Sequence, residues 1–157
     1  MSIKKLSFVD NKSINAVAIG GAVLGSGGGG DPYVGKLMAQ QSIEETGGVE
    51  VIDIESLPDD ALILPIAMMG APTVMVEKFP SGNEFAQLIP MIEKMLTKPV
   101  AAILCIEAGG LNSTIPFSAA SKLGLPIIDG DAMGRAFPEL QMVTFTLGGI
   151  SATPMAM

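Results

Sequence analysis

Charged side chains that could do chemistry are concentrated in one short segment, residues 129–139 (DGDAMGRAFPE). It holds Asp129, Asp131 and Glu139 together with Arg135, the only arginine of the 157-residue chain. A guanidinium group is a planar fork of donors that suits a carboxylate or an anionic ligand. The segment therefore indicates either a functional site or a surface loop in which Arg135 pairs with a neighbouring carboxylate, because charges cluster in both.

Two further segments combine polar or glycine residues with a position directly after an apolar stretch. Residues 68–72 (MMGAP) bring Gly70, and residues 107–112 (EAGGLN) bring Glu107 and Asn112. Glu107 is consistent both with a surface charge at the end of a strand and with a site carboxylate. Asn112 is consistent with a ligand-binding residue and with a helix cap.

A glycine run, residues 25–30 (GSGGGG), comes directly before Asp31 and Pro32. Its backbone N–H groups could approach an anion, but the lysine and hydroxyl pattern of a phosphate-binding loop is missing. Three interpretations stay open: close backbone packing between two helices, phosphate binding, or contact with a polar ligand. The last would make ligand-binding residues of Gly27, Gly28, Gly29, Gly30 and Asp31.

The chain contains no histidine, so the commonest general base and metal ligand is missing. Any base would be an Asp, a Glu, a lysine (Lys36, Lys78 or Lys122) or Tyr33. Any metal would be bound by oxygens, which favours a hard divalent cation over zinc. Cys105 is the only cysteine and lies in an apolar stretch, which favours a core residue over a nucleophile and a reducing compartment over an oxidising one.

The elements that must position these residues alternate along the chain. Apolar periodicity and capping signals predict helices over residues 13–24, 31–46, 83–97 and 112–122. Apolar stretches predict strands over residues 49–54, 61–69, 100–106, 126–129 and 141–147. The first helix is apolar nearly all round, which predicts that it is buried.

Continuous apolar strands separated by helices predict an α/β fold, a three-layer, Rossmann-like arrangement with a mostly parallel sheet and helices on both faces. We expect residues 1–157 to form a single domain. Ligands of such sheets bind at the carboxyl ends of the strands. Because the segments 68–72, 107–112 and 129–139 all follow predicted strands, we expect them to share one pocket.

The composition limits the classes of partner. A formal net charge of −7 argues against nucleic acid and against an anionic membrane surface. The longest uncharged apolar stretch, residues 61–76, is interrupted by proline and glycine and is shorter than the roughly 20 residues that a spanning helix needs. Since 48% of the residues are hydrophobic, we expect a homo-oligomer that covers part of its apolar surface. Residues 1–12 show no secretory signal and the only cysteine lies in an apolar stretch, so we expect a cytoplasmic protein.

Several motifs in this order resemble one known family. They are residues 24–33 (LGSGGGGDPY), 69–74 (MGAPTV) with Glu77 and Lys78, 107–112, Leu125–Pro126 and 129–141 (DGDAMGRAFPELQ). This arrangement resembles the N-terminal domain of the S-methyl thiohydantoin desulfurase family, over about residues 15–155. The family was long described as a bacterial and archaeal domain of unknown function, associated with hydantoin utilisation.

The resemblance implies a hydrolase-type enzyme that removes a sulfur substituent from a hydantoin-like ring, a small-molecule substrate. It implies catalytic roles for Glu107, Asp129, Asp131 and Arg135. One of the carboxylates Glu107 and Asp131 would activate water or hold a divalent metal, and Arg135 would hold an anionic group of the substrate.

Members of this family are roughly twice as long and carry a second domain, so the chain is expected to correspond to the N-terminal half, a truncated form. Two other classes of function stay open. One is a module that binds a small anion or carboxylate without catalysis. The other is a fragment that self-associates through an exposed apolar face.

Overall fold

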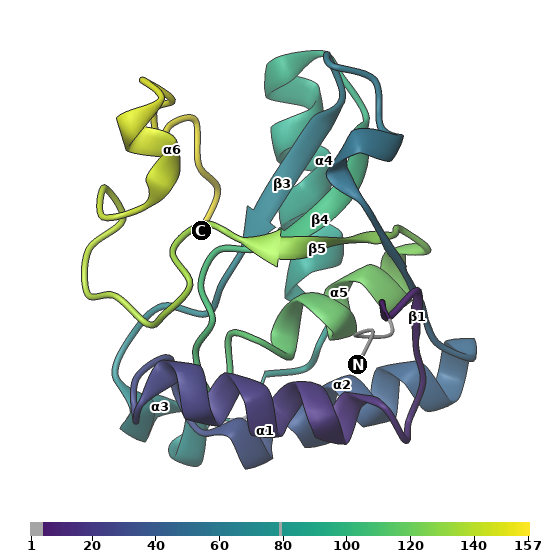
Figure 1. Ribbon diagram of the computed structural model, residues 1–157, viewed down its shortest axis with the longest axis vertical. Coiled ribbons are helices and arrows are strands. Elements are labelled where there is room, and N and C mark those ends of the chain that lie inside the picture. Colours follow the sequence, from purple (N-terminus) through teal and green to yellow (C-terminus); the bar gives the residue numbers. More distant parts are fainter. Residues whose placement is uncertain (1–4, 79) are drawn as a thin grey trace.

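The computed structural model describes residues 5–78 and 80–157 and shows an α/β arrangement around one sheet (Figure 1). The strands are β1 (Phe8–Val9), β2 (Val49–Ile52), β3 (Leu62–Ile66), β4 (Val100–Cys105) and β5 (Ile127–Asp131). The helices are α1 (Ile14–Gly25), α2 (Pro32–Thr46), α3 (Pro72–Glu77), α4 (Glu84–Leu96), α5 (Ile115–Leu123) and α6 (Thr144–Leu147), with a 3₁₀ turn η1 (Ile54–Ser56).

The sheet has the order β1-β2-β5-β4-β3, and every pair except the antiparallel β1–β2 pair is parallel. This confirms the predicted α/β class with a mostly parallel sheet. The register pairs Ile66 with Cys105 and Cys105 with Asp131. The carboxyl ends of β3, β4 and β5 therefore lie side by side, and the loops that follow them start from one edge of the sheet.

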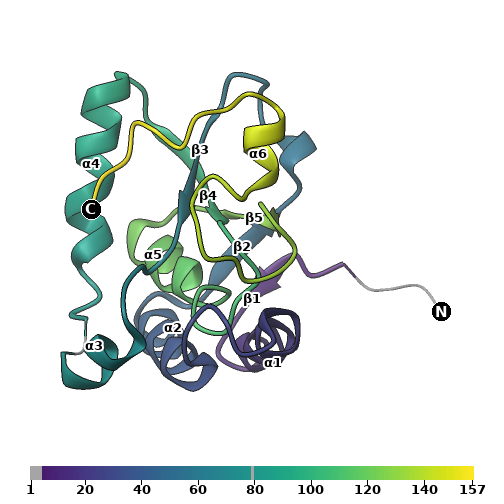
Figure 2. The same ribbon diagram turned by 90° about the vertical axis from the view of Figure 1, so that its left-hand side faces the viewer.

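The two faces of the sheet are covered unequally. The four long helices α1, α2, α4 and α5 all contribute to one large core with strand residues such as Ile103 and Ile127. The other face carries a small cluster around Leu104 and Ile128, covered by Phe145 of the short helix α6. Figure 2 shows α6 on the opposite side of the sheet from α5, with the C-terminal segment running from α6 towards α4.

Local signals explain most of the helix boundaries. Asp31 caps α2 by accepting a hydrogen bond from the backbone N–H of Tyr33 at 2.8 Å, and Pro32 occupies the first helical position. The helix ends at Gly47 in the left-handed conformation. In α4 the predicted apolar stripe buries Phe85, Ile89 and Ile92.

The prediction that the first helix is buried all round is wrong. The residues of α1 that are buried include Ala18, Gly21 and Gly25, whereas Ile19 and Val23 are 67% and 70% exposed. The backbone of α1 approaches the loop after β4 so closely that a Cβ atom at Gly21 would overlap Ser113, and one at Gly25 would be crowded by the backbone of Gly109 and Gly110. Small residues are therefore required where α1 faces this loop, while Ile14 at the start of the helix is buried in the core and Ile19 and Val23 remain exposed.

The predicted strand over residues 141–147 is also wrong, because this segment turns into α6. Both the backbone N–H and the hydroxyl of Thr144 donate to the carbonyl oxygen of Ala132, at 2.8 and 2.9 Å. These contacts hold the segment against the loop after β5, where it starts a turn and has no neighbouring strand to pair with. The sequence analysis also missed the short elements β1 and α3.

Candidate functional site

A cleft of about 840 Å³ lies at the carboxyl ends of β3 and β4. The three segments that were expected to share a pocket all contribute to it. The lining residues are Met68 to Ala71 after β3, Ile106, Glu107, Leu111 and Asn112 after β4, and Phe137 to Leu140 after β5. Gly29 and Gly30 of the glycine run also line it. Five of the predicted site residues therefore line one cleft, and these are Gly29, Gly30, Gly70, Glu107 and Asn112.

Glu107 is the carboxylate at the centre of this arrangement. It is only 5% exposed, yet it lines the cleft. Its Oε1 accepts a hydrogen bond from the side-chain amide of Asn112 at 2.6 Å, and its Oε2 accepts one from the backbone N–H of Phe137 at 2.9 Å. A buried carboxylate needs such partners. Each oxygen keeps lone-pair capacity for a further donor in the cleft.

Asn112 holds two loops together around Glu107. Its Oδ1 accepts from the backbone N–H of Met68 at 2.8 Å, and its Nδ2 also lies 3.3 Å from the carbonyl oxygen of Met68. The loop after β3 is thus joined to the loop after β4 by a side chain that is 5% exposed. Asn112 precedes α5 by three residues, so positioning of this cleft, and not capping, is the role its contacts support.

Asp131 joins the loops after β4 and β5. Its Oδ2 accepts from the backbone N–H groups of Ala108 at 2.9 Å, Gly134 at 2.6 Å and Met133 at 3.4 Å. Asp131 is not among the residues that line the cleft. Its contacts are those of a residue that fixes the position of the loop carrying Glu107.

The glycine run packs against the loop after β4, backbone to backbone. The carbonyl oxygen of Gly29 accepts from the N–H groups of Leu111 and Asn112 at 2.7 and 3.1 Å, and that of Gly28 accepts from Gly110 at 3.0 Å. Gly29 has a φ of +75°, and a Cβ atom there would overlap the backbone of Gly109. Close backbone packing was expected between two helices, whereas the run packs against the loop after β4, and Gly29 and Gly30 also line the cleft. Contact of the run with a phosphate or another polar ligand stays a prediction.

The remaining predicted residues lie away from the cleft. Arg135 is exposed, its Nε donates to the carbonyl oxygen of Ala136 at 3.0 Å, and within residues 5–78 and 80–157 it forms no salt bridge. Asp129 is exposed and is not among the residues that line the cleft. Neither Gly27 nor Gly28 lines the cleft, and Asp31 is the cap of α2.

The side chains present do not assemble a metal site by themselves. In the part of the chain that the structure describes, no three His, Cys, Asp or Glu side chains come together in a way that could hold an ion. Glu107 and Asp131 are hydrogen-bonded to an amide side chain and to backbone N–H groups.

Comparison with known proteins assigns the family. A family model described as the S-Me-THD-like, N-terminal domain matches residues 12–157. The chain belongs to this family. The resemblance of its motifs to the N-terminal domain of the S-methyl thiohydantoin desulfurases is thereby confirmed. No curated protein matches the chain.

Solved structures include a relative similar to this S-Me-THD-like domain. It is the crystal structure of a protein from Chromobacterium violaceum, with a TM-score of 0.76 and 26% sequence identity. The match covers 95% of this chain and 41% of the other. The S-Me-THD-like domain therefore spans less than half the length of this structural relative.

Two features of the S-Me-THD-like domain were not predicted as parts of the site. Lys78 lines the cleft, although sequence analysis considered it only as a possible base. The backbone N–H of Phe137 is the second donor to Glu107, and no side-chain pattern could reveal it.

Cys105, predicted to be a core residue, packs against the large core, and burial raises the pKa of its thiol to about 12. None of the helices in the described ranges is long and apolar enough to cross a membrane.

Proposed function

We propose that this domain supplies the ring-binding cleft of an enzyme that hydrolyses the sulfur substituent from a hydantoin-like ring. One observation carries the proposal: the buried carboxylate of Glu107 faces a cleft built from the loops after three parallel strands. In parallel α/β sheets this edge is where ligands bind. The family match supports the substrate class.

Glu107 is suited to act on water in this cleft. Its oxygens are held in place by Asn112 and Phe137, so a water donating to a free lone pair would be oriented for attack. For an S-methyl thiohydantoin, the water oxygen forms a bond to the ring carbon and the C–S bond breaks. One proton of the water ends on the ring nitrogen and the other on the sulfur of the departing methanethiol. Glu107 accepts one of these protons from the attacking water and delivers it to its final acceptor.

The walls of the cleft fit a sulfur-bearing ring. Met68, Met69 and Met75 line it and offer flexible, polarisable thioether surfaces. The charged side chains that line it are Glu84, Glu107, Glu139 and Lys78, so acidic groups outnumber basic ones among the described residues. This balance disfavours a module for small anions and favours a neutral ring.

The test uses S-methyl thiohydantoin with the purified chain. Binding is measured by isothermal titration calorimetry, and methanethiol release is followed with a chromogenic thiol reagent. We expect saturable binding, and we expect Glu107→Gln to lower any release by about 100-fold or more, which is typical for removal of a general base. Glu50→Gln, an exposed carboxylate on β2, is the matched control and should change neither quantity.

The outcomes separate the alternatives. If the chain binds the ring but releases no methanethiol, the alternative of a binding module stands and the catalytic role proposed for Glu107 in this chain is contradicted. A folded chain that shows no binding would refute the proposal altogether. Equal rates for Glu107→Gln and the unmodified chain would remove Glu107 from the mechanism.

A further inference from the structure

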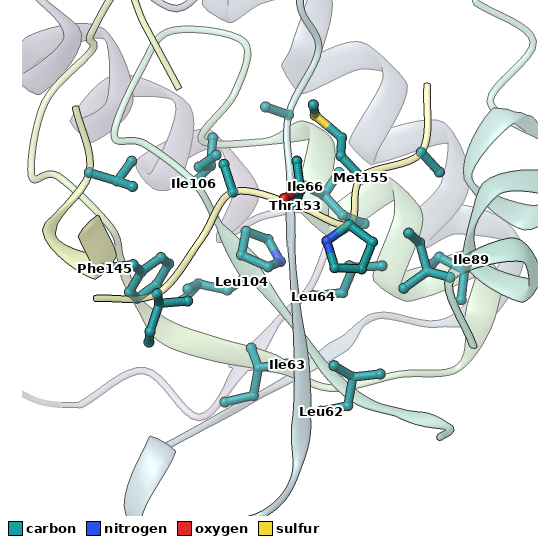
Figure 3. A pocket seen from close by; sticks show the side chains of 18 of the residues that line it. Leu62, Ile63, Leu64, Ile66, Ile89, Leu104, Ile106, Phe145, Thr153 and Met155 are labelled. Carbon is teal, nitrogen blue, oxygen red and sulfur yellow. The ribbon is translucent and has the colours of Figure 1, made fainter. Parts of the chain in front are cut away.

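A second hollow, of about 670 Å³, runs along the edge strand β3. One wall is β3 itself with its neighbour Leu104, and another is α4, with residues such as Ile89 and Ile92. The C-terminal segment from Ile150 to Ala156 crosses in front of β3 and forms the outer wall. In Figure 3 this segment passes Ile66 and Leu104, with Phe145 of α6 on one side and Ile89 of α4 on the other.

The lining of this hollow is apolar. No Asp, Glu, Lys or Arg is among the described residues that line it, and Ser151 and Thr153 carry its only hydroxyl groups. A charged group placed here would lose its hydration without a partner. The chemistry of the walls thus selects alkyl or aryl groups.

The hollow adjoins the cleft that contains Glu107. Three residues line both: Ala67, Ile106 and Leu140. Ile106 directly precedes Glu107, and Ala67 directly precedes Met68, the residue held by Asn112. The cleft that contains Glu107 and the apolar hollow therefore meet at Ile106 and Ala67, which directly precede Glu107 and the residue held by Asn112.

We infer that the hollow along β3 is a subsite for a large apolar substituent of the ring that binds beside Glu107. This inference rests on the proposed function and narrows its substrate class to rings carrying a branched alkyl or aryl group. The polar edge of the ring lies at Glu107, and its substituent passes Ala67 to reach the hollow. Ala67, as a small residue at the junction, determines whether the substituent can enter.

The inference predicts a graded affinity. Each methylene removed from water in such a subsite strengthens binding about fourfold. We expect an S-methyl thiohydantoin with a 5-isobutyl group to bind at least ten times more tightly than the ring without a substituent. A 5-(2-carboxyethyl) group of similar length should bring no gain, because the walls offer no cationic partner.

Two matched variants of the full chain locate the effect, each measured by calorimetry with all three compounds. Ala67→Leu narrows the junction and should reduce the isobutyl gain, taken as the ratio of the affinities of the isobutyl compound and the unsubstituted ring in the same variant, to less than threefold. Ala86→Leu adds the same side chain at an exposed position of α4 that lines neither the hollow nor the cleft, and it should keep the gain. Thermal unfolding of both variants establishes that they are folded.

A spectroscopic measurement keeps the inference testable if Ala67→Leu does not fold. Methyl signals of Leu104 and Ile66 in the unmodified chain should shift with the isobutyl compound and not with the unsubstituted ring. Tight binding of the unsubstituted ring with no gain from the isobutyl group would overturn the subsite and leave the proposed function standing. Failure of all the rings to bind would refute both.

Discussion

At the residue scale, the site depends on one asparagine as much as on its carboxylate. Asn112 contacts the backbone of Met68, 44 residues away along the chain, and the carboxylate of Glu107, five residues away in its own loop. It therefore joins the loop after β3 to the loop after β4. It is buried, and its removal leaves a buried carboxylate oxygen of Glu107 and the part-buried backbone N–H of Met68 without their partners. These contacts hold the carboxylate of Glu107 and the loop after β3 in position at the cleft.

We predict that Asn112→Ala lowers the free energy of unfolding by about 2–4 kcal/mol, the cost of leaving the buried oxygen of Glu107 and the part-buried N–H of Met68 unpaired. Asn83→Ala is the matched control. Asn83 is exposed and makes no capping hydrogen bond to α4, so its replacement should change stability by less than about 0.5 kcal/mol. Urea unfolding of both variants measures the difference, and equal values would show that the Asn112 contacts contribute little to the fold.

At the element scale, two prolines occupy opposite kinds of helix position. Pro90 lies in the interior of α4 and is exposed, where it removes a backbone donor and strains the preceding turn. Pro32 occupies the first position of α2, where its fixed φ is favourable and no donor is lost. The amphipathic stripe of α4, with Phe85, Ile89 and Ile92 buried, holds the helix in place despite Pro90.

We predict that Pro90→Ala raises the free energy of unfolding by about 1–3 kcal/mol, because alanine restores the donor in the helix interior. Pro32→Ala should leave stability unchanged or lower it by about 0.5 kcal/mol. Thermal and urea unfolding compare the two variants. A loss of stability in Pro90→Ala would mean that the proline ring makes packing contacts that outweigh its cost to the helix.

At the scale of the whole molecule, the sheet separates a thick core from a thin one. Cys105 lies on β4 at the thick core, and burial, helped by the charge of Asp131, raises the pKa of its thiol to about 12. The protonated thiol therefore stabilises the folded chain below about pH 9.0, and this contribution is lost as the pH rises towards 12. Access to Cys105 consequently reports on opening of the core.

We predict that Cys105 reacts with iodoacetamide at pH 8 about 1,000-fold more slowly in the folded chain than in urea, because a pKa near 12 in place of 9.0 reduces the thiolate fraction by that factor. The modified fraction is followed by mass spectrometry. The urea-unfolded chain is its own control, since it has the same single thiol. Comparable rates in both states would show that β4 is accessible in the native protein.

The sequence by itself determined the local elements and the edge of the sheet at which the site lies. Apolar stretches and capping residues such as Asp31 act over a few residues, so β4, α2 and α4 were predictable. Parallel connectivity then brings the ends of β3, β4 and β5 together, which placed Glu107 and Gly70 in one cleft. The family motifs identified the class of domain.

Only the tertiary structure decided which side chains face the cleft. Arg135 and Asp129 share a segment with Glu139, yet they point elsewhere, because direction depends on the turn after β5 and on the loops it contacts. The partners of Glu107 come from Asn112 and from a backbone N–H at Phe137, 30 residues away. Such long-range contacts, like the turn of α6 against Ala132, arise from packing between distant segments, which no local periodicity encodes.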